Sequence, residues 1–246
     1  MTGETIWTSL DDGRSFATPR FATISGVDHL VVFTDRYLSS LNPENGQTRW
    51  TFEFGVKKTQ DRFNAVTPLI VGNRVVVASG PGAGSLCIEM QADGTAKEMW
   101  RERRNLDSQF NNLVCVDDMV FGFTSSRINQ AEFRCLSLDN GEVRWAYTSD
   151  LYRGTSIAVD DKLILLGESG DLIVLQINQK EPIVIYESPE PVLGKPSYSA
   201  PALSNGRLYL RDETILKCIS LRSDLTSSRD ESVPSRPRPA VLRGES

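Results

Sequence analysis

Eight side chains in this sequence carry groups that bind anions or carbonyl oxygens, and they recur in comparable surroundings. Arginine and lysine attract negative charge, while amides and a phenol form directional hydrogen bonds with carbonyl and hydroxyl groups. The set comprises Arg14, Arg62, Asn64, Asn111, Asn112, Arg153, Lys195 and Tyr198. Gathered around one opening, these groups would hold a protein or carbohydrate partner. Spread apart, they would be ordinary solvated loop residues.

Residue combinations typical of catalysis or metal binding do not occur in the sequence. His29 is the only histidine, so a Ser-His-Asp or Cys-His mechanism would have to use it. It follows Ser25-Gly26 closely, and we expect a solvated residue of a hairpin turn. The four cysteines form no CxxC or Cys-His pair, which argues against zinc. We therefore predict no catalytic residue and no metal ligand.

Two acidic pairs and a glycine-rich stretch have structural explanations. Asp117-Asp118 and Asp160-Asp161 would suggest calcium, but such a site needs about six converging oxygens, which one turn cannot supply. Asp is favoured in tight turns because its side chain bonds to its own backbone. Residues 80–84 lack the following helix and the Lys-Ser/Thr pair of a phosphate-binding loop, so we expect a hairpin connection there.

The composition is that of a globular protein with a mildly acidic balance. The chain has 246 residues, with 27 basic and 32 acidic side chains and a net charge of −5. A general nucleic-acid binder needs a basic surface, so we expect no nucleic-acid partner. No run approaches the roughly 20 apolar residues that span a bilayer. Residues 1–10 lack the pattern of a signal peptide.

The four tryptophans reveal an internal repeat that would position the groups above. Gly3 to Trp7, Gly46 to Trp50 and Gly141 to Trp145 share one spacing, and Gly94 leads to Trp100 with two extra residues. The tryptophans lie 43, 50 and 45 residues apart, and a further 41 residues lead to Tyr186. Periods of this length are typical of propeller blades.

Each repeat also contains a tight turn between two short β-rich runs. The turns are Ser25-Gly26, Gly72-Asn73, Asp117-Asp118, Asp160-Asp161 and Asn205-Gly206. Such pairs between β-rich runs predict hairpins. A third run follows each hairpin, and a further turn leads into the run that carries the tryptophan. Four strands per 41–50 residues, with almost no helical periodicity, predict an all-β propeller of about five blades.

The third run of each repeat has a small or medium residue at one fixed position. These residues are Ser40, Cys87, Cys135, Val174 and Cys218. We expect each of them to lie beneath a tryptophan, where a bulkier side chain would collide with the indole ring. Because Cys87, Cys135 and Cys218 then lie on separate sheets, we expect no disulfide among them.

The segments Ser40 to Trp50 and Cys135 to Trp145 resemble the tryptophan-docking motif of quinoprotein-type (PQQ-like) propeller repeats, Ala-x-Asp-x-x-Thr-Gly-x-x-x-Trp. Ser or Cys replaces Ala, Asn or Ser replaces Asp, and Asn replaces Thr. The resemblance covers residues 2–222 and implies a docking role for Trp7, Gly46, Trp50, Trp100, Gly141 and Trp145. The family includes PQQ-dependent dehydrogenases and the non-enzymatic outer-membrane assembly lipoprotein BamB. Its alcohol dehydrogenases carry a vicinal cysteine pair over the cofactor, which this sequence lacks.

The repeats divide the chain into one propeller domain and a tail. We expect an orphan strand at residues 2–10, repeats at about 14–54, 61–104, 108–149, 152–188 and 195–222, and a disordered tail at 223–246. The orphan strand either completes a closed five-blade ring or belongs to a propeller of seven or eight blades, which the family favours. An open arc exposes apolar blade faces and predicts self-association. A truncated start would also have lost an export signal, and the family suggests a periplasmic or exported protein.

In a propeller, the loops that lead into the innermost strands surround one mouth of the central channel. The eight groups named first lie in these predicted loops. We therefore predict a non-catalytic scaffold that binds a protein or carbohydrate partner at the mouth, without a cofactor. The alternatives are a PQQ-dependent dehydrogenase, which would require PQQ and calcium, and a sensor domain of a larger signalling protein.

Overall fold

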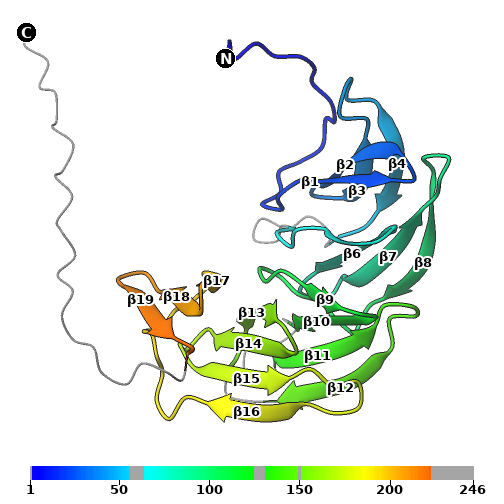
Figure 1. Ribbon diagram of the computed structural model, residues 1–246. Helices are drawn as coiled ribbons and strands as arrows, with labels where there is room; N and C mark the ends of the chain where they lie inside the picture. Colours follow the sequence, from blue (N-terminus) through cyan, green and yellow to red (C-terminus); the bar gives the residue numbers. More distant parts are fainter. Residues whose placement is uncertain (1, 56–63, 125–130, 149–150, 223–246) are drawn as a thin grey trace, which may run out of the picture.

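The computed structural model describes residues 2–55, 64–124, 131–148 and 151–222. These residues form nineteen strands in five antiparallel sheets and no helix, so the predicted all-β class is confirmed. The sheets, which we call blades 1 to 5 in chain order, follow one another along an arc, as in part of a propeller (Figure 1). The first strand of each blade lies on the concave side of this arc. None of the described residues forms a helix able to cross a membrane.

The strands of each blade are neighbours in chain order, so each blade is a simple meander. Blade 1 comprises β1 (Arg20–Ile24), β2 (Val27–Phe33), β3 (Tyr37–Leu41) and β4 (Thr48–Glu53). Blade 2 comprises β5 (Leu69–Val71), β6 (Arg74–Ser79), β7 (Gly84–Met90) and β8 (Ala96–Glu102). Blade 3 comprises β9 (Val114–Val116), β10 (Met119–Phe123), β11 (Glu132–Ser137) and β12 (Val143–Thr148). Blade 4 comprises β13 (Gly154–Val159), β14 (Lys162–Gly167), β15 (Leu172–Gln176) and β16 (Ile183–Glu187). Blade 5 comprises β17 (Ala202–Ser204), β18 (Arg207–Arg211) and β19 (Leu216–Ser220).

The first hairpin of every blade has a two-residue turn at the predicted place. In blade 1, Ile24 pairs with Val27, and the same spacing recurs in the other four blades. The first residue of each turn has a positive φ, namely Ser25, Gly72, Asp117, Asp160 and Asn205. The left-handed conformation gives these short turns the twist that the flanking strands require. Turn chemistry therefore accounts for both acidic pairs.

His29 is not a solvated turn residue, contrary to the expectation from sequence. The turn ends at Gly26, so His29 is the third residue of β2 and its side chain is fully buried. Its Nδ1 lies 2.8 Å from Ser40 Oγ, while Nε2 has no hydrogen-bond partner in the described part of the chain. Burial, and to a lesser extent the charge of Arg49, lowers the pKa of the imidazole. His29 is therefore a core residue.

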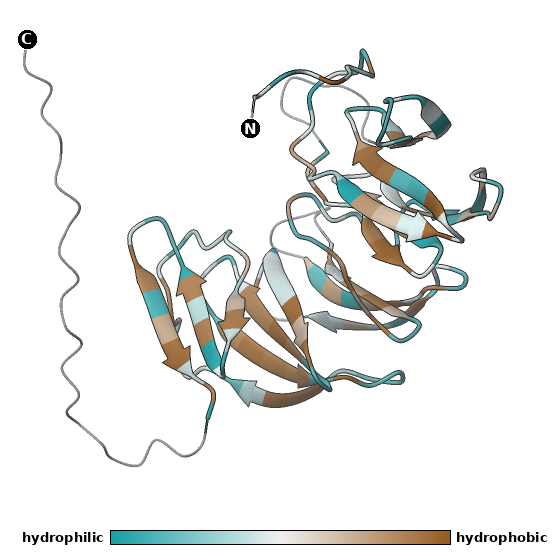
Figure 2. Ribbon diagram, turned by 45° about the horizontal axis from the view of Figure 1, so that its top comes forward, coloured by the Kyte–Doolittle hydropathy of each residue, from teal (hydrophilic) through white to brown (hydrophobic). Residues whose placement is uncertain are grey.

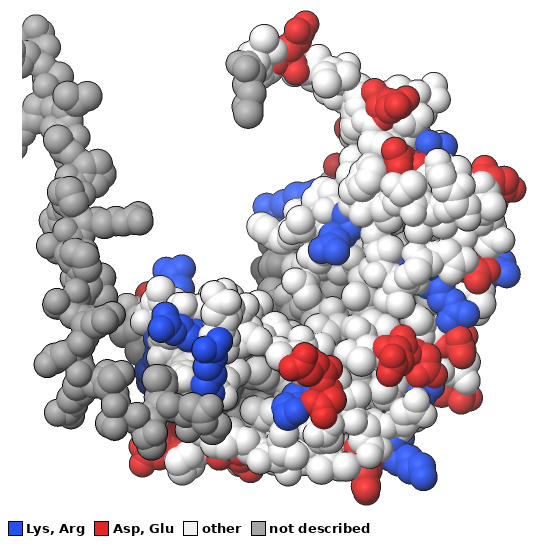
Figure 3. Space-filling model, in the orientation of Figure 1, with Lys and Arg blue, Asp and Glu red and all other residues white. Residues whose placement is uncertain are grey.

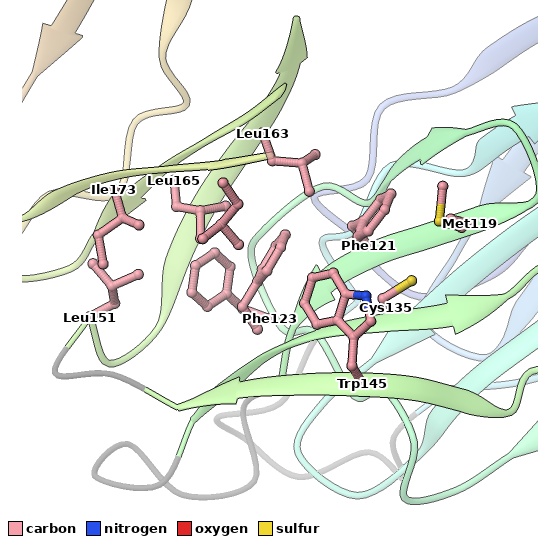
Figure 4. Close-up of a cluster of buried hydrophobic side chains, with 11 residues drawn as sticks. Met119, Phe121, Phe123, Cys135, Trp145, Leu151, Leu163, Leu165 and Ile173 are labelled. Atoms are coloured by element: carbon pink, nitrogen blue, oxygen red, sulfur yellow. The ribbon is translucent and has the colours of Figure 1, made fainter. Parts of the chain in front are cut away.

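Buried apolar side chains fill the spaces between neighbouring blades. Four hydrophobic clusters join blade 1 to blade 2, blade 2 to blade 3, blade 3 to blade 4, and blade 4 to blade 5. Figure 2 shows hydrophobic residues along the strands and more hydrophilic residues in the turns. Between blades 3 and 4, the rings of Phe121, Phe123 and Trp145 pack with Leu163 and Leu165 (Figure 4). Burial of apolar surface between blades thus holds the arc together.

Tryptophan docking onto the following blade is observed as the repeat predicts. Nε1 of Trp100 in blade 2 donates to the Leu138 carbonyl in blade 3 at 2.9 Å. A Cβ added at Gly141 would lie 2.7 Å from the Trp100 ring, and φ there is +72°, so only glycine suits the position. Trp145 in turn donates to the Asn178 carbonyl of blade 4 at 2.8 Å.

Residues 2–10 do not form the predicted orphan strand. Strand β1 begins at Arg20, and residues 2–19 belong to no sheet because no described strand lies beside them to pair with. Trp7 nevertheless occupies a tryptophan position of the repeat. Its Nε1 donates to the Pro43 carbonyl at 2.9 Å, and a Cβ at Gly46 would lie 2.5 Å from its ring. Trp7 therefore docks onto blade 1 although residues 2–10 form no strand.

Trp50 differs from the other tryptophans in its contact with the next blade. Its side chain is buried, but Nε1 has no hydrogen-bond partner among the described residues. The ring also stays more than 4 Å from the place where a Cβ at Gly94 would lie. Seven positions separate Cys87 from Gly94, whereas six separate Cys135 from Gly141. The longer turn of blade 2 explains the loss of the usual contacts.

In blades 1 to 4 the small residue of the third strand lies opposite the large ring of its own blade, as predicted, whereas no described strand lies opposite Cys218 on the outer side of β19. Ser40 pairs with Trp50, and Cys87 and Cys135 pair with Trp100 and Trp145. In blade 4, Val174 pairs with Tyr186, which therefore takes the tryptophan position. A β-bulge follows the small residue in all four of these blades. The four cysteines are free thiols, and Cys87 and Cys135 lie on separate sheets.

Two further expectations concern segments between and beyond the strands. Residues 80–83 form the turn between β6 and β7, since Ser79 pairs with Gly84, and this confirms the predicted hairpin connection. Arg62 and the predicted tail at residues 223–246 lie outside the described residues.

Candidate binding site at the channel mouth

A polar and aromatic cluster forms where the loops before the innermost strands of blades 3, 4 and 5 meet. Three of the predicted site residues, Arg153, Lys195 and Tyr198, take part in it. Three residues that the sequence did not single out join them: Phe110, Tyr152 and Glu168. We call these six residues the mouth cluster. The short strands β9 and β13 are neighbours on the concave side of the arc and bring two of the loops together.

The centre of the mouth cluster is a buried ion pair between Arg153 and Glu168. Arg153 Nε lies 3.1 Å from Glu168 Oε2, and Nη2 donates to Oε1 at 3.3 Å, so the contact is bidentate. The two side chains are only 15% and 8% exposed. The hydroxyl of Tyr198, from the blade 5 loop, donates to the same Oε1 at 2.9 Å. Residues of two blades are thus locked together around one carboxylate.

Aromatic rings cover this ion pair on its solvent side. The Arg153 guanidinium carbon lies 5.5 Å from the centre of the Phe110 ring, within the range of a cation–π contact. The rings of Phe110 and Tyr198 are 6.3 Å apart between centroids. Phe110 is 39% exposed and Tyr198 is 50% exposed, so both present ring surface to solvent. Lys195 Nζ lies 4.7 Å from the centre of the Tyr152 ring beside them.

The ionisation of the cluster follows from these contacts. Burial would raise the pKa of Glu168, but hydrogen bonds from Arg153 and Tyr198 and the charges of Arg153 and Lys195 outweigh it, so the pKa is lowered. Burial and the hydrogen bond to Glu168 raise the pKa of the Tyr198 phenol. Glu168 is therefore an ionised acceptor with its oxygens already engaged, and Tyr198 stays protonated as a donor.

Asn64 is a structural residue and not a ligand group at the mouth. Its side chain is 1% exposed. Nδ2 donates to the carbonyls of Thr34 at 2.7 Å and Asp35 at 3.1 Å, and Oδ1 accepts a hydrogen bond from Ser79. The amide thus fastens blade 2 to the connection between β2 and β3 of blade 1, and its burial keeps it from contact with a partner.

The other predicted site residues lie outside the mouth cluster. Asn112 Oδ1 accepts the backbone N–H of Thr67 at 3.0 Å and so bridges blades 2 and 3. Asn111 is only 9% exposed. Arg14 is exposed on the segment that precedes β1, in blade 1. Among the described members of the predicted ring, those that lie together are therefore on one side of the mouth, formed by blades 3 to 5.

Glu168 is one of the three members of the cluster that the sequence did not single out, although a signal for it exists. It lies in the connection between the second and third strands of blade 4. Acidic residues occupy the same connection in blade 1, as Asp35, and in blade 5, as Asp212, which accepts the backbone N–H of Gly194 at 2.8 Å. Asp35 accepts the backbone N–H of Gly13 at 2.9 Å. An acid recurring at one place of the repeat, beside the loop into an innermost strand, would have pointed to this role.

The described residues hold no cluster of metal-ligating side chains, and whether the chain takes a cofactor stays a prediction. No group of three or more His, Cys, Asp or Glu side chains in the described segments is placed to hold a metal ion. The one buried carboxylate of the mouth cluster, Glu168, is engaged by Arg153 and Tyr198. On the face drawn in Figure 3, basic and acidic side chains are scattered among uncharged ones.

The class of protein follows from the docked blades: this is a β-propeller of PQQ-like repeats, with an arc of five blades described. The sequence profile of the family described as outer membrane protein assembly factor BamB matches residues 1–147, which is more than half of the 246 residues. The chain therefore belongs to the BamB family of propeller repeats. None of the curated proteins matches it.

Solved structures with the same fold are similar only at low sequence identity. BamB from Moraxella catarrhalis has a TM-score of 0.56 and 18% identity, with 83% of this chain and 57% of that chain covered. The quinohemoprotein alcohol dehydrogenase ADHIIG from Pseudomonas putida HK5 has a TM-score of 0.55 and 15% identity, covering 88% and 43%. The computationally designed Ika4 protein has a TM-score of 0.52 and 11% identity, covering 72% and 100%. This chain spans about half the length of the two natural propellers, and the likeness establishes the fold alone.

Proposed function

We propose that this chain is a non-catalytic propeller that binds a protein partner through the mouth cluster. The observation that carries the proposal is the convergence of exposed aromatic rings and a buried ion pair from neighbouring blades. Aromatic and arginine side chains supply most of the binding energy in protein interfaces, because they bury large areas at low entropic cost. The Arg153–Glu168 pair holds Tyr198 in place before a partner arrives, which reduces the cost of ordering on binding.

The charges of the cluster favour a protein segment with acidic or carbonyl groups. Arg153 and Lys195 contribute two positive charges and Glu168 one negative charge, so the cluster is net positive within an acidic chain. Lys195 makes its contact with a ring and so keeps its ammonium donors available for a carboxylate or a backbone carbonyl. Glu168 is poorly suited to act as a general base, because its pKa is lowered and its oxygens are engaged. Binding is thus better supported than catalysis.

Site-specific photo-cross-linking tests this proposal. A photoreactive phenylalanine analogue placed at Phe110 should give one defined polypeptide adduct in the native organism. The same analogue at Ile183, which is 36% exposed on the outer strand β16 and so matches Phe110 at 39%, should not. The adduct should disappear when Tyr198→Ala is added. The cross-linked polypeptide, once identified and purified, should bind the chain in vitro without other components.

Three outcomes would contradict the proposal. Equal cross-linking from Phe110 and Ile183 would show that the mouth is not the preferred surface. Specific and saturable binding to a glycan, with no protein adduct, would favour a carbohydrate partner. Tight stoichiometric uptake of PQQ and calcium, followed by dye-linked oxidation of an alcohol, would favour a dehydrogenase.

A further inference from the structure

Blade 5 ends in an open edge. Among the described residues it has three strands, and β19 pairs only with β18, whereas the third strand of every other blade is covered by a fourth. Leu216 on β19 is 71% exposed and Cys218 is exposed as well. An exposed strand presents a row of backbone N–H and C=O groups that are ready to pair with another chain. Among the described residues, the edge of β19 is therefore open to one more strand.

The opposite end of the arc carries a segment with fourth-strand character and no sheet of its own. Gly3 to Trp7 has the spacing found in the fourth strands of blades 1 and 3. Trp7 is docked on blade 1 through Pro43 and Gly46, as Trp100 is docked on blade 3. The residues around Trp7 belong to no sheet, and Ile6 beside it is 87% exposed. Figure 1 shows this segment at the opposite end of the arc from β19.

We propose that residues 4–10 of one copy add to β19 of a second copy as the missing fourth strand, so that chains associate head to tail. Within one molecule the two elements are kept apart. The buried clusters join only consecutive blades, and none of those in the described part of the chain joins blade 5 to blade 1. Because Trp7 fixes the segment to blade 1, the β19 edge that it reaches belongs to another molecule.

The repeat fixes the register of this pairing. In blades 1 to 3 the small residue of the third strand lies opposite the tryptophan, so Cys218 lies opposite Trp7. One residue further along, Ser39 pairs with Thr51 in blade 1, and their hydroxyl oxygens are 3.1 Å apart. The equivalent pair at the new junction is Lys217 and Thr8. Their side chains should therefore meet across the interface.

The surroundings of β19 suit an added strand. A groove of about 650 Å³ lies between blades 4 and 5, with Tyr186, Leu203 and Ile219 among its apolar lining residues. After the bulge that follows the small residue, Ile219 would pair with Thr5 of the incoming segment. That segment would then border the groove and cover part of its apolar surface. The contact is heterologous, with different surfaces on the two copies, so it generates chains or rings and not a closed two-fold dimer.

Disulfide trapping tests the register and the partner together. Thr8→Cys and Lys217→Cys are combined in a Cys218→Ser background and oxidised under mild conditions. Non-reducing electrophoresis should show disulfide-linked dimers and higher species as the main product. The control pair, Thr8→Cys with Ser220→Cys, lies three residues out of register, about 10 Å along the strand and beyond the roughly 7 Å reach of a disulfide. This control variant should remain monomeric, which would also show that the remaining native cysteines do not form intermolecular disulfides.

Sedimentation velocity of the unmodified chain provides an independent readout. The weight-average sedimentation coefficient should rise with protein concentration, and Thr8→Pro should abolish this rise. Thr8 lies outside every strand of the described chain, so the substitution leaves the five sheets intact. A cross-link formed within single chains, equal cross-linking of both cysteine pairs, or a monomer at all concentrations would each overturn the proposal.

Discussion

Two tryptophans in equivalent places give a matched test of how the blades are held together. Trp50 and Trp100 are 8% and 7% exposed and lie in neighbouring blades. Nε1 of Trp100 donates to the Leu138 carbonyl at 2.9 Å, whereas Nε1 of Trp50 is buried without a partner among the described residues. Substitution of each by phenylalanine removes a similar amount of ring surface. The two variants therefore differ mainly in whether the N–H group that is removed had a hydrogen-bond partner.

The hydrogen bond decides the expected difference. Trp100→Phe loses a net contribution of about 1 kcal/mol and leaves the Leu138 carbonyl unpaired, which costs about 1 kcal/mol or more. Trp50→Phe removes an N–H that is already unpaired and so relieves a desolvation cost of about 1 kcal/mol or more. The loss of apolar area destabilises both variants by a similar amount. We expect Trp100→Phe to lower the free energy of unfolding by about 3 kcal/mol more than Trp50→Phe.

Urea unfolding followed by far-ultraviolet circular dichroism measures this difference without relying on tryptophan fluorescence. Similar m values in the two variants would show that the same surface is exposed on unfolding, so that the midpoints can be compared. Equal destabilisation, or a larger effect at Trp50, would refute the inference that the indole hydrogen bond to the next blade stabilises the docked state.

Three further predictions follow from buried or paired groups. Burial raises the pKa of the Cys87 thiol to about 12, so a maleimide at pH 8 should label exposed Cys218 rapidly and Cys87 only after unfolding, as read by mass spectrometry of peptides. The pKa of His29 in the folded state lies below its ordinary value, so near pH 6 the unfolded state binds more protons than the folded state. The free energy of unfolding, measured by urea unfolding, should therefore fall as the pH is lowered from 7 to 5, and it should fall less steeply in His29→Leu. Arg153→Gln leaves the buried Glu168 carboxylate unpaired and should destabilise the chain by about 3 kcal/mol, while adding Glu168→Gln should restore most of that loss in thermal unfolding.

Much of the fold could be predicted from the sequence because the same turn residues and the same pairing of a small residue with an aromatic ring recur in successive repeats. The two-residue turns and the pairing of small residues with rings both follow from local sterics, and Cys135 opposite Trp145 is one instance. The prediction that His29 lies in a turn is wrong because the two-residue turn already ends at Gly26. His29, three residues further on, therefore belongs to β2. Trp50 lacks the indole hydrogen bond to the next blade because the turn of blade 2 is one residue longer. The effect of that extra residue depends on the three-dimensional path of the turn.

The site was only partly predictable, since proximity between loops depends on how the blades are angled. Arg153, Lys195 and Tyr198, which come from the loops that the pattern indicated, do lie together, while their binding role stays a prediction. The pattern did not indicate that Asn64 would be used inside the fold, because an asparagine in a loop has the same sequence context in either role. Glu168 joins the cluster through the adjacent β14–β15 connection, and its importance appears only when its partners from two blades are seen around it.

The affinity of the purified partner for the mouth cluster tests the central claim most directly. Titration calorimetry with the identified partner should show binding weakened by at least about tenfold in Tyr198→Ala, since a central aromatic anchor contributes well over 1 kcal/mol. Ile183→Ala, on the outer rim, should leave the affinity unchanged. An undiminished affinity in Tyr198→Ala, or a comparable loss in Ile183→Ala, would contradict the assignment of the channel mouth as the binding surface.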